Sequence, residues 1–337
     1  MYSAQTHDLK TLLAAQIARA CAVFCVDEIV VFNDGQSHKS QSRGGAWASQ
    51  GGSEVDGYTG YSDPDDFLYH VLSYLETPPH LRKSLFPMHP NLRTAGAMPS
   101  LDMPHHLRAN EWCQYREGVT LSREASQSEQ QEQKKRKNGS VGEETTLVDC
   151  GLPGRARIPV SIPANTRVTV KFRTIEEPSM DDNTTLLADA VSPDTPREEA
   201  GYYWGYSTRI ASSLSSVFTE CPYDGGYDLS LGTSERGVDV ATLLETATGG
   251  ESSGVSPVPQ SWSHMVIVFG GVAGLEVALK ADHELASRGV TEAKDVFDYW
   301  LNLVPQQGSR TIRTEEAVWL GLMGLRSVVK NRATAGL

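Results

Sequence analysis

The sequence has no apolar run close to the roughly 18 residues of a membrane-spanning helix. Its first residues, MYSAQTHDLK, lack the basic and then apolar order of a secretory signal peptide. The five cysteines are scattered, odd in number and without a CxxC pair, which predicts neither a disulfide framework nor a metal site. We therefore expect a protein of a reducing compartment, nuclear, nucleolar or cytoplasmic.

Positive charge is also scarce, because 30 Lys and Arg stand against 42 Asp and Glu and the formal net charge is −12. Indiscriminate binding to nucleic acid depends on dense Lys and Arg that release counterions from the phosphates. Any RNA contact of this chain would therefore need a local basic face.

Several catalytic motifs are missing as well. The sequence has no G-x-x-x-x-G-K-[ST] phosphate loop, no HExxH metal motif and no G-x-S-x-G serine elbow. The segment MVIVFGGVAGLE looks like a strand that feeds a glycine turn, but Gly270, Gly271 and Gly274 do not form G-x-G-x-x-G. A nicotinamide-dependent oxidoreductase is kept only as an alternative, which nucleotide binding would distinguish.

Helical and strand patterns alternate towards both ends of the chain. Apolar spacing predicts helices over 8–25 and 65–76, EIVVF (28–32) predicts a strand, and 35–64 predicts a loop rich in Gly, Ser and Asp. From residue 200 onward we expect a helix over YYWGYSTRIASSLSSVF, strands over YDLSL and SHMVIVFGG, a helix that ends in DVFDYWLNLVP, and a last helix over AVWLGLMGLRSVV.

The middle of the chain has the texture of a small all-β module. Short alternating segments, REGVTL, TTLVDCGL, RARIPVSI and RVTVKF, are separated by turn residues between 109 and 175. A polar run at 122–145 predicts a disordered excursion, and its KKRK (134–137) is similar to a nuclear import signal. These patterns predict an α/β domain interrupted by a small barrel.

Three polar loops, rich in Gly, Ser and Thr, adjoin the predicted strands of the C-terminal part. They are GTSERG (232–237), GGVAGLE (270–276) and QGSRTIRTEEA (307–317). In open α/β sheets ligands lie beyond the carboxyl ends of the strands, and such loops can offer backbone groups to a nucleoside. Each loop alone could be a simple strand-to-helix turn, with Thr314 as the N-cap of the last helix.

A basic stripe is predicted on the β module, where residues 153–175 contain no Asp or Glu. In RVTVKFR, Arg167, Lys171 and Arg173 share one parity and would face away from Val168, Val170 and Phe172. Because OB-type barrels bind nucleic acid through such grooves, we expect RNA contacts. The alternative is a solubilising strand face. The candidate RNA-binding residues are Arg155, Arg157, Arg167, Lys171 and Arg173.

Six segments carry a resemblance to a known family: ARACAVFCVDEIVVF, LDMPHHLR, YYWGYSTR, YDLSLGTSERG, VIVFGG and QGSRTIRTEEA. Together they closely resemble a eukaryotic and archaeal family of RNA methyltransferases in the SPOUT superfamily. The likeness covers nearly the whole chain outside 35–60, 122–145 and 180–198, and GTSERG combined with TIRTEEA is its specific part. The QGSRTIRTEEA loop also looks like the corresponding loop of bacterial ribosomal RNA methyltransferases that modify N3 of a uridine.

The resemblance implies a SPOUT-type α/β knot, in which the C-terminal part forms a trefoil knot and a small OB-like β-barrel is inserted. Residues 1–104 and 188–337 would form the methyltransferase domain, and residues 105–187 the barrel. The resemblance further implies S-adenosyl-L-methionine as the methyl donor, RNA as the substrate and a homodimer, without a metal or a membrane.

The loops and the resemblance together assign candidate site residues. Those expected at the cofactor are Gly232, Thr233, Ser234, Glu235, Gly237, Phe269, Gly270, Gly271, Gln307, Gly308, Ser309, Thr311, Ile312, Arg313, Thr314 and Ala317. Arg209, Arg236 and Arg313 are candidates to hold a phosphate or to stabilise an anionic base. Glu235 and Glu315 are candidate bases, and capping of the last helix is the other role for Glu315.

Two alternatives stay open at this stage. A non-catalytic RNA-binding protein or scaffold of the spindle or centromere could retain the same pocket, and transfer from a labelled donor would distinguish it from an enzyme. Members of the family also begin with an apolar strand and a proline-glycine turn before the first helix, whereas MYSAQTHDLK has neither. Either the sequence is truncated or the sheet lacks a strand, which would leave a strand edge unpaired.

Overall fold

The computed structural model of the protein describes residues 6–36, 57–122, 145–179, 181, 184–247, 256–259, 261–271 and 273–335. Most of the expected loop at 35–64 and of the expected excursion at 122–145, with its KKRK, lies outside these residues. The chain divides into two compact units: Met1–Ser73, Pro90–Pro99 and Tyr206–Leu337 form the first, and Tyr74–His89 and Ser100–Gly205 form the second. None of the helices in the described ranges is long and apolar enough to cross a bilayer.

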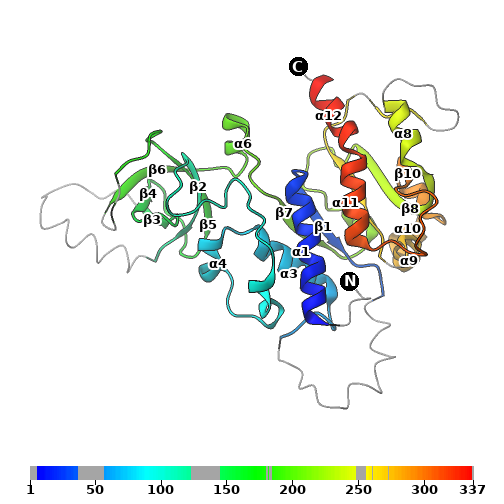
Figure 1. Ribbon diagram of the computed structural model, residues 1–337, viewed down its shortest axis with the longest axis horizontal. Helices are drawn as coiled ribbons and strands as arrows, with labels where there is room; N and C mark the ends of the chain where they lie inside the picture. Colours follow the sequence, from blue (N-terminus) through cyan, green and yellow to red (C-terminus); the bar gives the residue numbers. More distant parts are fainter. Residues whose placement is uncertain are drawn as a thin grey trace, which may run out of the picture. The chain divides into compact units, whose positions relative to one another are not determined.

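The first unit is an α/β body with two small sheets (Figure 1). In one sheet β1 (Glu28–Phe32) pairs with β7 (Ser207–Ala211). In the other, β10 (Tyr299–Asn302), β8 (Leu229–Asp239) and β9 (Met265–Val268) lie in the order β10–β8–β9. All pairings are parallel. The expected α/β class is therefore confirmed for this unit.

Helices separate these strands along the chain, as parallel pairing requires. They are α1 (His7–Val23), α3 (Pro64–Glu76), α7 (Leu214–Thr219), α8 (Val240–Ala247), α9 (Leu275–Ala281), α10 (His283–Ser287), α11 (Thr314–Gly324) and α12 (Arg326–Ala335), with short 3-10 turns at Pro90–Leu92, Ala95–Ala97 and Ala293–Val296. In Figure 1, α1 and α11 run side by side, and the rings of Phe24 and Trp319 meet edge to face at 5.9 Å between centroids. A capping oxygen begins α1, because the Thr6 hydroxyl accepts from the Leu9 backbone N–H at 3.2 Å.

The second unit holds a closed five-stranded barrel of order β2–β3–β4–β6–β5. Its strands are β2 (Tyr115–Thr120), β3 (Thr146–Asp149), β4 (Arg155–Ile158), β5 (Arg167–Phe172) and β6 (Thr185–Val191), and α4 (Pro79–Leu85) and α6 (Thr195–Ala200) accompany them. The expected β module is confirmed, and so is the parity of β5, since Val168, Val170 and Phe172 pack into the barrel core. The sequence patterns missed β6.

Two of the predicted helices are wrong. Within YYWGYSTRIASSLSSVF, only Leu214–Thr219 is helical, and Ser207–Ala211 forms β7. Gly205, which has a φ of +96°, interrupts the pattern. DVFDYWLNLVP contains β10, where Tyr299 and Leu301 are buried and alternate with partly exposed neighbours. Apolar residues on one side of a short strand imitate a helical stripe when the run is this brief.

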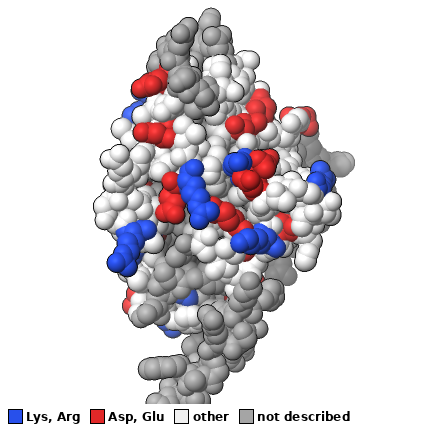
Figure 2. Space-filling model, turned by 90° about the vertical axis from the view of Figure 1, so that its right-hand side faces the viewer, with Lys and Arg blue, Asp and Glu red and all other residues white. Residues whose placement is uncertain are grey.

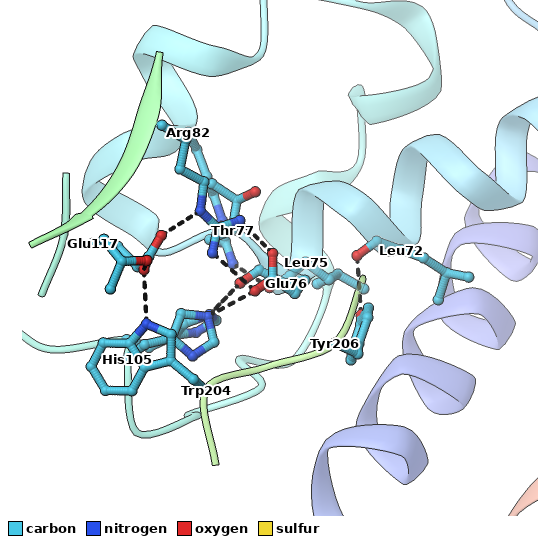
Figure 3. Close-up of polar contacts among 12 residues, drawn as sticks. Leu72, Leu75, Glu76, Thr77, Arg82, His105, Glu117, Trp204 and Tyr206 are labelled. Carbon is cyan, nitrogen blue, oxygen red and sulfur yellow. Dashed lines mark hydrogen bonds and ion pairs between the residues drawn. The ribbon is translucent and has the colours of Figure 1, made fainter. Parts of the chain in front are cut away.

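A buried ion network holds the second unit together (Figure 3). The Arg167 guanidinium donates to the Glu76 carboxylate at 2.6 and 3.0 Å and to Glu117 at 2.6 Å. The Trp204 indole donates to Glu117 at 2.8 Å, and His105 Nε2 lies 3.0 Å from a Glu76 carboxylate oxygen. Thus β5, β2 and the end of α3 share one cluster of charges, and Arg167 lies at its centre.

Two groups of this cluster have shifted pKa values. Burial alone would raise the pKa of Glu76, but hydrogen bonds from His105 and Arg167 lower it to about 2. Burial lowers the pKa of His106 to about 3, and its Nε2 donates to the Glu76 backbone carbonyl at 2.6 Å. For both groups the unfolded chain binds protons more readily than the folded protein does, so acid favours unfolding.

We expect Glu76→Gln to lower the free energy of unfolding of the second unit by about 2 kcal/mol, because it removes the buried carboxylate that pairs with the partly exposed Arg167. Wild-type stability should fall as the pH drops below the unfolded His106 value of 6.5, and more steeply below the 4.5 of Glu76. Urea unfolding followed by tryptophan fluorescence measures both. Asp189→Asn, which breaks the exposed pair with Arg173, is the control and should cost less than about 1 kcal/mol. Equal losses in the two variants would contradict the central role of the network.

Candidate active site

The GTSERG segment bulges out of β8. Gly232 pairs with Trp300 of β10, and Val238 pairs with the next residue, Leu301, so residues 233–237 leave the ladder between them. The Asn302 side-chain amide donates to the Glu235 carbonyl at 2.8 Å and fixes the bulge. The expected loop is therefore real, but it lies within a strand and not after one.

Two glycines are required for packing at this bulge. A Cβ at Gly237 would lie 2.3 Å from the backbone carbonyl carbon of Leu301, and a Cβ at Gly232 would lie 2.5 Å from the Phe297 ring. Neither position tolerates a side chain unless β10 or its aromatic neighbour moves. These glycines let β8 and β10 approach each other closely, and they set the shape of the loop.

Hydrogen bonds connect the three predicted loops. The Thr233 hydroxyl donates to the Val268 carbonyl at 3.0 Å, and the Thr314 hydroxyl donates to the Gly270 carbonyl at 3.2 Å. The N-cap of α11 is Arg313, whose backbone N–H donates to the Glu316 carboxylate at 3.0 Å. The prediction of Thr314 as the N-cap is wrong by one residue, and its hydroxyl instead joins the third loop to the second.

A cavity of about 420 Å³ adjoins two of these loops. Phe269, Gly270 and Gly271 line it from the second loop and Thr314 from the third, whereas none of the residues 232–237 does. The Phe269 ring packs on α11, where a Cβ at Gly321 would lie 2.9 Å from it. Phe269, which follows β9, therefore packs on α11 and also lines the cavity.

The charged candidate site residues near the loops lie in two kinds of position, exposed on the loops or buried in α11. Glu235, Arg236 and Arg313 are exposed on the loops, and the Arg236 guanidinium lies 3.9 Å from Glu276 at the start of α9. Glu315 is only 6% exposed in the first turn of α11. The structure does not bring Arg209 to this group.

Arg209 belongs to a separate network at the start of β1. Its guanidinium donates to Glu28 at 2.9 Å, to the Tyr227 hydroxyl at 3.2 Å and to the Val217 carbonyl at 3.1 Å. The Tyr227 hydroxyl also donates to Glu28. These partners join β1, β7 and α7, so Arg209 stabilises the sheet.

Cations and acids are mixed on one face of the described surface (Figure 2). Figure 2 shows one face on which Lys and Arg lie beside Asp and Glu and form no continuous basic area among the residues drawn in colour. The predicted stripe of β5 is paired in the same way: Lys171 with Glu199, Arg173 with Asp189, and Arg167 inside the buried network. On β4, Arg155 lies 3.6 Å from Asp149, and Arg157 Nε is buried without a hydrogen-bond partner among the described residues.

Comparison with known proteins assigns the chain to a family. A family model described as "Putative RNA methyltransferase" matches residues 1–325. The chain belongs to this RNA methyltransferase family. The "28S rRNA (uridine-N(3))-methyltransferase" of Homo sapiens is 40% identical over 329 residues, which cover 96% of this chain and 74% of the relative. The protein of the same name from Mus musculus is 40% identical over 325 residues (96% and 73%), and that from Drosophila melanogaster is 36% identical over 324 residues (96% and 59%).

Family membership makes the three connected loops the candidate active site of an RNA methyltransferase. Sequence reasoning missed Asn302, because the strand that carries it was predicted as a helix. It also missed Asp34, which follows β1 and whose carboxylate would lie 3.2 Å from a Cβ at Gly271. The NDG turn at 33–35 was the available signal. The described residues contain no group of three or more His, Cys, Asp or Glu side chains that could hold a metal ion.

Loss of the Asn302 amide should loosen the bulge that carries Glu235 and Arg236. We expect Asn302→Ala to slow methyl transfer at least about tenfold while it lowers stability by only about 1 kcal/mol, because one hydrogen bond is removed at a partly exposed site. Transfer from a labelled donor and urea unfolding measure the two effects. Thr174→Ala, which removes a side-chain hydrogen bond to the Glu176 carbonyl in the second unit, is the control. Unchanged transfer by Asn302→Ala would mean that the bulge does not position the reacting groups.

Proposed function

We propose that this protein transfers the methyl group of S-adenosyl-L-methionine to N3 of a uridine in ribosomal RNA. The observation that carries the proposal is the set of hydrogen bonds from Thr233 to the end of β9, from Thr314 to Gly270 and from Asn302 to the bulge, in a chain 40% identical to proteins named for this reaction. Those names favour the enzyme over the scaffold and the oxidoreductase. We accordingly expect the protein to act in the nucleus, the nucleolus or the cytoplasm.

The loops suit a nucleoside-containing donor. A Cβ at Gly308 would meet nothing within 4 Å, so the third loop leaves open space where a ligand can approach the backbone. Phe269 offers an aromatic surface, and Gly270 and Gly271 offer backbone groups beside the cavity. We propose that the candidate residues of 232–237, 269–271 and 307–317 hold the donor, largely through backbone groups.

The donor, when bound, supplies a methyl group that is already activated by its sulfonium. The protein then has to place uridine N3 in line with that group, to exclude water and to accept the N3 proton. We propose that the exposed Glu235 carboxylate accepts this proton. The bulge presents the Glu235 side chain, and the Asn302 amide fixes its backbone by a hydrogen bond. The exposed Arg236 and Arg313 stabilise the anionic base or hold a neighbouring phosphate.

We further propose the SPOUT-type knot for the first unit, an OB-like role for the barrel and a homodimer. The dimer proposal rests on α11, which exposes Leu320 (46%) and Met323 (60%) next to the third loop. Exposed apolar side chains on one helix are typical of an interface. The aromatic residues of YYWGYSTR do not offer a comparable surface, because Trp204 and Tyr206 are buried.

Gly308→Val tests the donor site. The Cβ of the new side chain meets no protein atom within 4 Å, so the fold should be unaffected, and the affinity for S-adenosyl-L-methionine should fall at least about tenfold, because the valine occupies the approach to the backbone. Isothermal titration calorimetry measures the affinity. Gly96→Val is a matched control, since a Cβ there also meets nothing within 4 Å. Equal affinity in both variants would place the donor elsewhere.

The barrel is proposed to contact RNA through its exposed cations, with Arg167 committed to the buried network. Lys171 and Arg173 pair with acids at exposed positions, where an ion pair contributes little and can be exchanged for a phosphate. Arg155 and Arg157 on β4 complete the proposed set.

We expect the double substitution Lys171→Gln and Arg173→Gln to weaken RNA binding at every sequence and to make the salt dependence shallower by roughly 1.4, about 0.7 for each phosphate contact. Donor affinity should not change. Filter binding at several salt concentrations measures the slope. The control is Arg288→Gln with Lys294→Gln, which removes the same charge from two exposed ion pairs of the first unit. If both double variants lower the slope equally, overall charge and not the barrel accounts for the effect.

A further inference from the structure

A leucine is exposed on the outer wall of the barrel. Leu187 of β6 is 55% exposed. Its neighbour Ala188 belongs to the barrel core, so the side chain of Leu187 points outward by the alternation of a strand. A single exposed leucine is common on protein surfaces. The side chains beside Leu187 therefore decide whether this one has a ligand.

Two arginines flank Leu187 in the neighbouring strands. β6 lies between β4 and β5 in the barrel (Figure 1). On one side Arg157 is the register partner of Leu187, and on the other the Arg173 backbone N–H donates to the Leu187 carbonyl at 3.1 Å. Ala156 and Phe172 belong to the barrel core, so the arginines that follow them also point outward. We call Arg157, Leu187 and Arg173 the Arg–Leu–Arg row.

The two cations of the row are available to a ligand. Arg157 has no acidic partner in the part of the chain that the structure describes, and its Nε has no hydrogen bond there. Arg173 pairs with Asp189, but both side chains are about half exposed, at 54% and 48%, and such a pair exchanges readily. Because neighbouring strands lie about 5 Å apart, the backbones of the two arginines are separated by about 10 Å.

The exposed apolar surface continues where the chain leaves β5. Ile175, two residues after Arg173, is 75% exposed. Its carbonyl accepts from the Trp112 indole N–H at 2.8 Å. The Trp112 ring packs in turn on Phe172 of the core, with 5.1 Å between the ring centroids. The barrel core therefore fixes the backbone on which these apolar side chains are exposed.

The chemistry of the row fits a nucleotide of unpaired RNA. A guanidinium binds a phosphate, and an apolar side chain packs on the face of a base. In an RNA duplex, stacking covers the faces of the bases, and proteins reach mainly phosphates and 2′-hydroxyls. The arginines alone would bind either form of RNA, whereas Leu187 finds a base only in the unpaired form.

The proposed methylation has the same requirement. N3 of uridine lies on the edge that forms base pairs, so the acceptor has to be unpaired when it reacts. Resting on the proposed function, we propose that the Arg–Leu–Arg row binds an unpaired nucleotide of the substrate RNA. The base packs on Leu187, and the flanking phosphates bind Arg157 and Arg173. The barrel thereby selects single-stranded RNA over duplex RNA.

The test compares Leu187→Phe with Leu187→Gln in the full chain. An aromatic ring stacks on a base, so Leu187→Phe should tighten the binding of an unpaired, U-rich RNA of about 12 nucleotides at least about threefold. Leu187→Gln removes the apolar surface and should weaken that binding at least about threefold. Neither substitution should change the affinity for the duplex of the same RNA with its complement. Fluorescence anisotropy measures both affinities.

Two further variants complete the design. Ile210→Gln is the matched control, because Ile210 is an apolar strand residue of the first unit that is 43% exposed, and it should bind the unpaired RNA as the wild type does. Arg157→Gln should weaken the binding of both forms and make the salt dependence for the unpaired RNA shallower by about 0.7. Unfolding midpoints within about 2 °C of the wild type verify that the variants fold.

Equal effects of the Leu187 substitutions on the unpaired RNA and on the duplex would overturn the proposal, and so would no effect on either. An equal loss in Ile210→Gln would also overturn it. A protein that transfers methyl groups normally while its Leu187 variants bind the unpaired RNA as the wild type does would refute the row alone. If the wild type transfers no methyl group to RNA, the proposed function fails, and the binding measurements still decide the row.

Discussion

Parallel pairing of β8 with β9 and β10 is the constraint on which the candidate site depends. Because the three strands point the same way, the bulge of β8, the end of β9 and the segment after β10 meet at one edge. Three hydroxyl or amide side chains then fasten the loops: Thr233 to β9, Thr314 to Gly270, and Asn302 to the bulge. Hydrogen bonds of ordinary length therefore order the loops, and Glu235 and Arg236 remain exposed on the bulge, where we propose that they meet the RNA.

Positive charge is used differently at the two ends of β5 in the second unit. Arg167 is only partly exposed and lies between two buried acids, Glu76 and Glu117, so the loss of either acid would leave its charge poorly compensated. Lys171 and Arg173 continue the same parity of β5 but pair with exposed acids. An exposed pair is worth little and exchanges readily, so only the outer cations of the stripe are available for phosphate. One strand thus contributes to the stability of the unit at one end and carries the proposed RNA contacts at the other.

The sequence predicted what depends on local periodicity. The helix at 8–25, the strand EIVVF and the parity of RVTVKF follow from spacing alone, and the structure confirms them. The strands β7 and β10 were missed because each is short and gains its stability from a parallel partner far along the chain. The loops could be located from their glycines. The residues that fasten them could not, since Asn302 acts through a strand register that no local pattern reveals.

The closed barrel and the two open sheets offer different groups to a ligand. The barrel has closed its ladder, so its strands have no free edge and its surface acts through side chains. The two sheets of the first unit are open, and in the part of the chain that the structure describes β1 and β9 line the cavity that Gly270, Gly271 and Thr314 also line. A ligand that enters this cavity therefore meets the backbone of β1 and β9 and also the loop that follows β9, whereas a ligand of the barrel meets its outward side chains.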